Sequence, residues 1–87
     1  MKPEVREAIC DMGYDEAVLL DSFDGAVVGV TTDGRVVYDY DAMVQCLVDQ
    51  DGMSEDEAIE FIEYNTVRSL PYVGEKAPII MNLLRLD

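Results

Sequence analysis

Two short apolar runs joined by an Asp-Gly turn restrict the fold of this 87-residue chain more than any other feature. Residues 26–30 and 35–40 are rich in valine and tyrosine, which favour β-strands, and Thr32, Asp33 and Gly34 lie between them. An Asp-Gly pair supports the positive φ that a tight hairpin turn requires. The sequence therefore predicts that the two runs pair as an antiparallel hairpin.

Two further apolar runs flank this hairpin. Residues 17–20 precede it, and residues 78–81 lie near the C-terminus. We expect residues 17–20 to extend the hairpin to a three-stranded antiparallel meander, and residues 78–81 to form a short C-terminal strand. The apolar runs are continuous, which indicates that helices cover at least one face of the sheet.

Apolar spacing predicts one helix before the hairpin and a second after it. Residues 3–12 have apolar side chains at i, i+3, i+4 and i+7, and Gly13 is placed to end that helix. Asp41 is the expected N-cap of the second helix, and Gly52 the residue that stops it. The apolar face predicted for the second helix consists of Tyr40, Met43, Val44, Leu47 and Val48. Tyr38 and Tyr40 should share one face of their strand and be buried or exposed together.

A capping box predicts the start of the third helix. Ser54 is followed three residues later by Glu57, the spacing at which each side chain bonds to the other residue's backbone N–H. Its predicted apolar face consists of Ala58, Phe61, Ile62 and Asn65, with Ile59 beside it. After Asn65 the pattern breaks, and Leu70-Pro71 and Gly74 indicate a loop. The expected fold is therefore α+β: an N-terminal helix, a three-stranded antiparallel meander, two helices and a short C-terminal strand.

The charge of the chain is distributed unevenly. The net charge is −13, and no Lys or Arg lies between Val36 and Val67, where nine acids occur. These acids are Asp39, Asp41, Asp49, Asp51, Glu55, Asp56, Glu57, Glu60 and Glu63. Hydrophobic residues make up 49% of the chain, which is too much for a disordered acidic tail, so residues 1–87 are expected to form one domain. Like charges on one surface repel one another, and this asymmetry predicts a positively charged partner.

Composition also excludes several classes of function. Six Lys and Arg residues are too few for direct binding to nucleic acid or to an anionic membrane. Two cysteines, Cys10 and Cys46, are too few for a disulfide framework. The sequence also has no apolar segment typical of a targeting signal or a membrane span, so we expect a cytoplasmic protein with free thiols. The chain has no His, the commonest general base and metal ligand.

No enzymatic activity, cofactor or metal site is therefore expected. The acids around Gly52 suggest a calcium loop, but with Gly52 at its sixth position Leu47 and Ala58 occupy the first and last ligand positions. Cys46 and Cys10 lack a neighbouring base and are expected to be small apolar residues.

One row of acids is the main candidate for a binding surface. Asp56, Glu60 and Glu63 follow i, i+4, i+7 spacing, which separates their Cβ atoms by about 5–6 Å. A row of this kind is loosely comparable to the phosphates of a nucleic-acid strand, although a solvated helix face has the same pattern. Tyr64 and Tyr72 flank the irregular segment and are candidate interface anchors. The candidate partner-binding residues are Asp49, Asp51, Glu55, Asp56, Glu57, Glu60, Glu63, Tyr64 and Tyr72.

Several segments of the chain resemble a family of short acidic proteins from bacteriophages and prophages. The segments are DGMSEDEAIEFIEYN at 51–65, GEKAPII at 74–80, GAVVGV at 25–30 and YDYD at 38–41, and the resemblance covers residues 14–81. It implies a phage or prophage origin rather than an activity. Small acidic phage proteins include many inhibitors of bacterial defence, such as anti-CRISPR proteins.

Two functions are expected on these grounds. The first is an inhibitor that binds a basic protein surface, with a CRISPR effector as the target that the resemblance favours, and that blocks nucleic-acid access by acidic mimicry. The second is a structural or assembly module, a homodimer joined through the apolar residues Leu83, Leu84 and Leu86.

Overall fold

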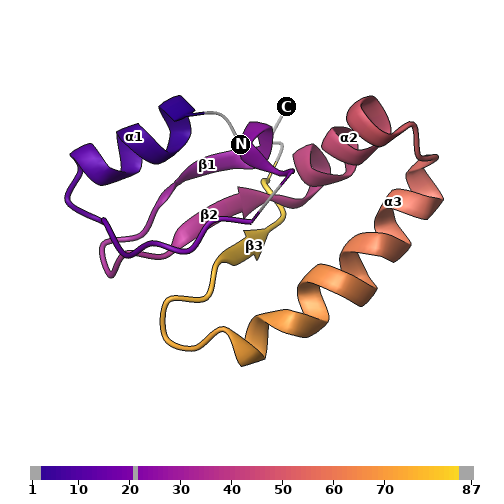
Figure 1. The fold of residues 1–87 in the computed structure, drawn as a ribbon. Helices are drawn as coiled ribbons and strands as arrows, with labels where there is room; N and C mark the ends of the chain where they lie inside the picture. Colours follow the sequence, from indigo (N-terminus) through magenta and orange to yellow (C-terminus); the bar gives the residue numbers. More distant parts are fainter. Residues whose placement is uncertain (1–2, 21, 85–87) are drawn as a thin grey trace.

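The computed structural model describes residues 3–20 and 22–84, and these form an α+β fold (Figure 1). A three-stranded sheet is combined with α-helices before and after its central hairpin, as the sequence predicts. In chain order the elements are α1 (Pro3–Asp11), η1 (Asp24–Ala26), β1 (Val27–Val30), β2 (Val36–Asp39), α2 (Tyr40–Asp51), α3 (Glu55–Phe61), η2 (Ile62–Thr66), η3 (Val67–Tyr72) and β3 (Ile79–Met81). Here η1 and η3 are 3-10 helices, whereas η2 is a π-helical turn.

The sheet is mixed and has the order β1-β2-β3. Strands β1 and β2 form the predicted antiparallel hairpin, in which Val30 lies opposite Val36. The turn is closed by a hydrogen bond of 2.8 Å from the Thr31 N–H to the Arg35 carbonyl, and Gly34 has a φ of +86°. Strand β3 confirms the predicted C-terminal strand, and it pairs with β2 in parallel.

The predicted antiparallel meander is wrong, because residues 17–20 form no strand. The Leu20 N–H donates instead to the Tyr38 hydroxyl, at 2.7 Å. Side chains stand roughly perpendicular to a sheet, so this bond places the segment over a face of the sheet rather than along an edge. The third strand is β3. A parallel pair needs a long crossover connection, and α2 and α3 supply it between β2 and β3.

The helix boundaries follow local signals. Gly13 and Gly52 follow α1 and α2 with φ of +95° and +70°, as expected of residues that end helices. The capping box is present, since the Ser54 N–H donates to Glu57 Oε1 at 3.0 Å and the Glu57 N–H to Ser54 Oγ at 3.2 Å. The prediction of Asp41 as the N-cap of α2 is wrong. Asp39 is the cap, because Tyr40 is already helical, and its carboxylate accepts from the Asp41 N–H at 3.2 Å.

Helical structure continues beyond Asn65, where a loop was predicted. The π turn η2 and the 3-10 helix η3 extend α3 to Tyr72, so that the three form one long rod (Figure 1). A π turn holds more residues than an α turn, which rotates the buried stripe around the helix. Phe61, predicted to lie on the apolar face, is 39% exposed, whereas Thr66 is buried.

The core lies between the sheet, α2 and the inner side of the α3 rod. Buried residues shared among these elements include Val36, Tyr38, Met43, Leu47 and Ile62. The predicted apolar face of α2 is confirmed, since its central residues are buried and those at its ends are partly buried against the core.

Tyr38 and Tyr40 are not equally buried, contrary to the prediction. Tyr38 is fully buried, but Tyr40 is only partly so, because the strand ends at Asp39 and Tyr40 opens α2. Neither Cys10 nor Cys46 forms a disulfide bond within the described residues; Cys46 is buried, as expected of a small apolar residue, and Cys10 is half-buried. Within residues 3–20 and 22–84, no helix has the length and apolar character needed to span a membrane.

Candidate functional site

The acids predicted to bind a partner lie at the α2–α3 corner and along α3, except Glu63, which lies in η2. All of them are exposed. Asp56 and Glu60 are four residues apart within one α-helix, so they occupy neighbouring positions on one side of α3. The Ser54–Glu57 capping box fixes the first turn of that helix and thereby the direction in which both carboxylates project.

Two members of this acidic set are held by neighbours. The backbone N–H of Ser54, and after it the Ser54 hydroxyl, lowers the pKa of Glu57 below its ordinary value. The Glu63 carboxylate accepts a hydrogen bond of 2.9 Å from the Tyr40 hydroxyl, and burial together with Glu63 raises the pKa of Tyr40. Glu63 lies in the π turn η2, and its hydrogen bond joins this turn to Tyr40, the first residue of α2. The carboxylates that remain available to a partner on this row are those of Asp56 and Glu60.

A shallow groove of about 340 Å³ lies beside these acids. It is lined by Met53, Glu57, Glu60, Phe61, Tyr64 and Asn65. Tyr64 is 62% exposed, and the guanidinium carbon of Arg68 lies 5.3 Å from the centre of its ring. A cation over an aromatic face is attracted by the ring, so Arg68 restrains the ring on the outer side of the rod. The groove therefore combines two carboxylates with an apolar and aromatic floor.

Tyr64 was predicted to be an interface residue, but Met53 and Phe61 were not. Phe61 was assigned to the core because its spacing from Ala58 fits the apolar stripe of a regular α-helix. In the structure Ala58 and Ile62 form the buried side of this segment, and Phe61, the last residue of α3, is 39% exposed beside it. Met53 lies between Gly52, which ends α2, and Ser54, the N-cap of α3, and it is half-buried at this corner. The sequence shows that an apolar residue occupies the corner, but not whether its side chain faces the core or the surface.

The other predicted residues are more widely spread. Tyr72 is 89% exposed but ends η3, at the opposite end of the rod from the α2–α3 corner. Asp49 and Asp51 lie in the last turn of α2, close to the start of α3, and the Asp49 carboxylate accepts from the Gln45 amide at 3.1 Å. The structure therefore gathers the candidate site around Asp56, Glu60 and Tyr64 and leaves Tyr72 outside it.

Two of the basic residues bind the backbone on the opposite side of the fold. Arg35 Nε donates to the Ala77 carbonyl at 2.8 Å, and the Lys76 ammonium donates to the Asp33 carbonyl. These bonds tie the hairpin turn to the segment before β3. A hydrogen bond from the Thr31 hydroxyl, and to a lesser degree Arg35 and Lys76, lowers the pKa of Asp33. Both cations therefore donate to backbone carbonyls and serve the fold.

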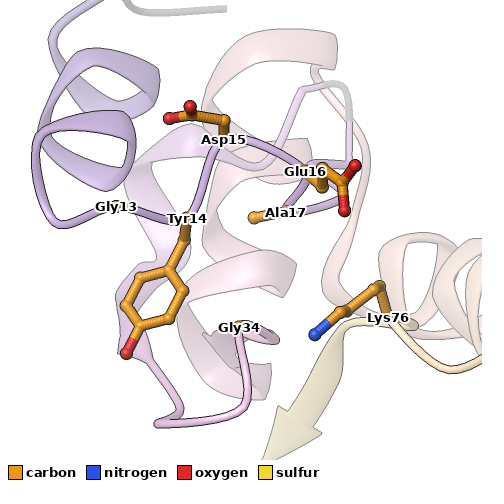
Figure 2. A pocket seen from close by; sticks show the side chains of 7 residues that line it. All are labelled: Gly13, Tyr14, Asp15, Glu16, Ala17, Gly34 and Lys76. Atoms are coloured by element: carbon orange, nitrogen blue, oxygen red, sulfur yellow. The ribbon is translucent and has the colours of Figure 1, made fainter.

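A second hollow, of about 380 Å³, lies beside this junction. Figure 2 shows the Tyr14 ring and the Lys76 ammonium on either side of Gly34, with Asp15 directed away from Lys76. A Cβ at Gly34 would lie 3.2 Å from Lys76 Nζ and 3.3 Å from Tyr14 Cδ1, so glycine is required for this close approach as well as for its positive φ. We therefore interpret this hollow as a place where Tyr14 and Lys76 pack against the hairpin turn, and not as a binding site.

In the part of the chain that the structure describes, no group of three or more Cys, Asp or Glu side chains is arranged to hold a metal ion. Comparisons of the chain with protein-family models, curated proteins and solved structures find no match.

Proposed function

We propose that this protein is a non-enzymatic inhibitor that binds a basic, nucleic-acid-binding surface of another protein. One observation carries the proposal: the exposed Glu60 lines the same groove as the exposed rings of Phe61 and Tyr64, at the end of α3 and the start of η2, and Asp56 lies one turn before Glu60 on the same side of α3. Aromatic anchors supply most of the affinity of a typical interface, whereas charges accelerate encounter and select the partner. The outer side of α3 offers both to a surface that is rich in Lys and Arg.

The resemblance to short acidic phage proteins supports a more specific version of the proposal. A phage protein of this kind acts in the cytoplasm of the host cell, where defence complexes hold DNA or RNA in basic channels. A CRISPR effector is the target class that we favour. The carboxylates of α3 would occupy phosphate positions in such a channel and so block nucleic-acid access.

The test compares two charge-reversal variants. Asp56→Lys/Glu60→Lys alters the proposed surface, and Asp15→Lys/Glu16→Lys alters two exposed acids next to the structural hollow. Both variants change the net charge equally, so a difference between them reports the position of the charge and not its amount. Glu63 is left unchanged because it bonds to Tyr40.

The assay measures binding of labelled target DNA to a panel of purified CRISPR effector complexes, with and without the protein. We expect the wild-type protein and Asp15→Lys/Glu16→Lys to displace DNA from a susceptible complex, and Asp56→Lys/Glu60→Lys to lose at least about tenfold in potency. Displacement should weaken as salt rises. Equal potency of the two variants would remove the α3 acids from the proposal, and no displacement from any complex would refute this target class.

A homodimeric assembly module is the second candidate, and one observation favours it. Leu84 is 85% exposed and Leu83 is 38% exposed, at the end of the described chain. Leu86, the third residue of the predicted dimer contact, lies outside the described residues. Light scattering across a concentration series tests this candidate: a dimer that Leu84→Asp dissociates would support it, and a monomer at every concentration would refute it.

A further inference from the structure

A hollow lined mainly by apolar residues lies between helix α1 and strand β1, away from the α3 surface. It has a volume of about 330 Å³ and is lined by Glu4, Val5, Ala8, Ile9, Met12, Val27, Val28, Gly29 and Val30. One wall is therefore a single side of α1, and the other is the whole length of β1. Figure 1 shows β1 between α1 and β2. The walls are incompletely covered, since Met12 is 62% exposed and Val28 is 49% exposed.

The strand that forms one wall is an edge strand. The sheet has the order β1-β2-β3, so only one side of β1 is paired within the described chain. An edge strand presents N–H and C=O groups in a row that can pair with another extended segment. A peptide that adds to such an edge gains main-chain hydrogen bonds, while its alternate side chains enter the neighbouring groove. The combination of an edge strand and a parallel-running apolar wall suits an extended occupant better than a helix.

The charge on α1 indicates which extended occupant fits. Glu4 is the one charged residue among those that line the groove. Glu7 and Asp11 follow it at i+3 and i+7 and Arg6 at i+2, and none of these three lines the groove. The charge in the lining of the groove is therefore negative. A second copy of the chain would bring a second net charge of −13 to this edge, which opposes pairing between copies.

We propose that the groove between α1 and β1 binds an extended segment of a partner protein in which apolar residues alternate with Lys or Arg. The segment pairs with the free edge of β1, its apolar side chains pack against Val5, Ala8 and Val28, and a cation faces Glu4, the acid in the lining, while the net charge of −13 favours a basic segment over an acidic one. This site is independent of the acidic surface on α3, so either can exist without the other.

The probe is a peptide of about six residues with alternating valine and lysine, acetylated and amidated at its ends, because four residues of β1 span about 13 Å. Two isomers carry N-methyl groups, either on every valine amide or on every lysine amide. Since alternate N–H groups of a strand point to opposite edges, each isomer blocks one edge and keeps the charge of the parent peptide. A valine–glutamate peptide is the charge control.

Binding is followed by the amide signals of the 15N-labelled protein. We expect the valine–lysine peptide to shift the signals of residues 27–30 and of α1, one N-methylated isomer to bind at least about tenfold more weakly, and the glutamate peptide not to bind. If both isomers bind like the parent, or if the shifts are confined to α3, strand addition at β1 is refuted. A protein that dimerises through β1 without peptide also refutes the proposal, because the occupant is then a second copy.

A variant on the protein side gives a second test. Val28→Lys places a cation in the groove, and Val73→Lys is the matched control, at a similarly exposed valine at the end of η3. We expect only Val28→Lys to weaken the valine–lysine peptide, by at least about tenfold. Equal affinity in the two variants contradicts the proposal. If Val28→Lys fails to fold by circular dichroism, the N-methylated peptides still decide the question on the wild-type protein.

Discussion

Replacing Tyr38 by Phe tests how residues 17–20 are held against the sheet. Tyr38 is fully buried, and its hydroxyl oxygen accepts the Leu20 N–H at 2.7 Å. The substitution keeps the ring and its packing, and it removes the oxygen. Leu20 is then left with a partly buried N–H that has lost its partner in a segment that belongs to no strand.

The expected loss of stability follows from that geometry. A buried donor that loses its acceptor costs about 1–3 kcal/mol, and because Leu20 is only half-buried, water recovers part of this. We therefore expect Tyr38→Phe to lower the free energy of unfolding by about 1–2 kcal/mol. For a domain of this size each kcal/mol lowers the melting temperature by about 4–8 °C. A small domain has a free energy of unfolding of only several kcal/mol, so a loss of this size should be measurable.

Urea unfolding followed by circular dichroism measures the change, with Tyr72→Phe as the control. Tyr72 is 89% exposed, so loss of its hydroxyl should alter stability by less than about 0.5 kcal/mol. Hydrogen exchange at the Leu20 amide provides a local measurement, and it should accelerate in Tyr38→Phe more than exchange in α2 does. If the two variants are equally stable, or if Leu20 exchange is unchanged, the hydrogen bond does not anchor this segment.

Three further predictions concern the helices. Ser54→Ala removes one half of the capping box and should cost about 1 kcal/mol in urea unfolding, whereas Ser69→Ala in η3 should cost less. The pKa of Glu57 is lowered in the folded protein, so its ionised form stabilises the protein above about pH 4.5, and this contribution is lost as the pH falls through the folded pKa. In urea unfolding, the difference in stability between the wild type and Glu57→Gln should therefore become smaller in acid. The pKa of Tyr40 is raised in the folded protein, so its neutral hydroxyl stabilises the fold below about pH 10, and this contribution is lost as the pH rises through the folded pKa. As the pH is raised, urea unfolding should therefore show a smaller loss of stability in Tyr40→Phe than in the wild type.

The parts of the fold that the sequence predicts are those fixed by neighbouring residues. The hairpin turn needs Gly34 at positive φ, α2 stops at Gly52, and α3 starts at the Ser54–Glu57 box. Each signal acts over four residues or fewer, so it can be identified without knowledge of the remaining chain. The N-cap of α2 was displaced by two residues because Asp39 and Asp41 are chemically equivalent candidates, and the choice depends on where β2 ends.

The pairing of the third strand could not be predicted in this way. Residues 17–20 and 79–81 are both short apolar runs, and either could add a third strand to the hairpin, the first beside β1, as the meander predicted, and the second at the other edge of β2. The α2–α3 crossover delivers Ile79 to that edge in parallel, opposite Val37, while the Leu20–Tyr38 bond places the earlier run on a face. Both arrangements depend on contacts between residues more than 15 positions apart in the sequence. The spacing of apolar residues within a short segment carries no information about such contacts.

The candidate site divides in the same manner. Exposure of the α3 acids followed from their number and spacing, whereas the groove beside them depends on the exposure of Phe61, which the spacing of Phe61 from Ala58 did not predict. The α1–β1 groove depends on the absence of a strand at residues 17–20. Had residues 17–20 been the strand that pairs with β1, as the meander predicted, no free β1 edge would remain.

Association and dissociation rates separate the effect of the total negative charge from that of a specific site on α3. A net charge of −13 accelerates encounter with any basic partner, and salt screens this effect beyond about 8 Å at physiological ionic strength. Reversal of acids anywhere on the protein should therefore lower the association rate. Only loss of groups in contact with the partner should raise the dissociation rate. If Asp56→Lys/Glu60→Lys and Asp15→Lys/Glu16→Lys change only association, and equally, the acids of α3 act through total charge; if the first variant also dissociates faster, they contact the partner.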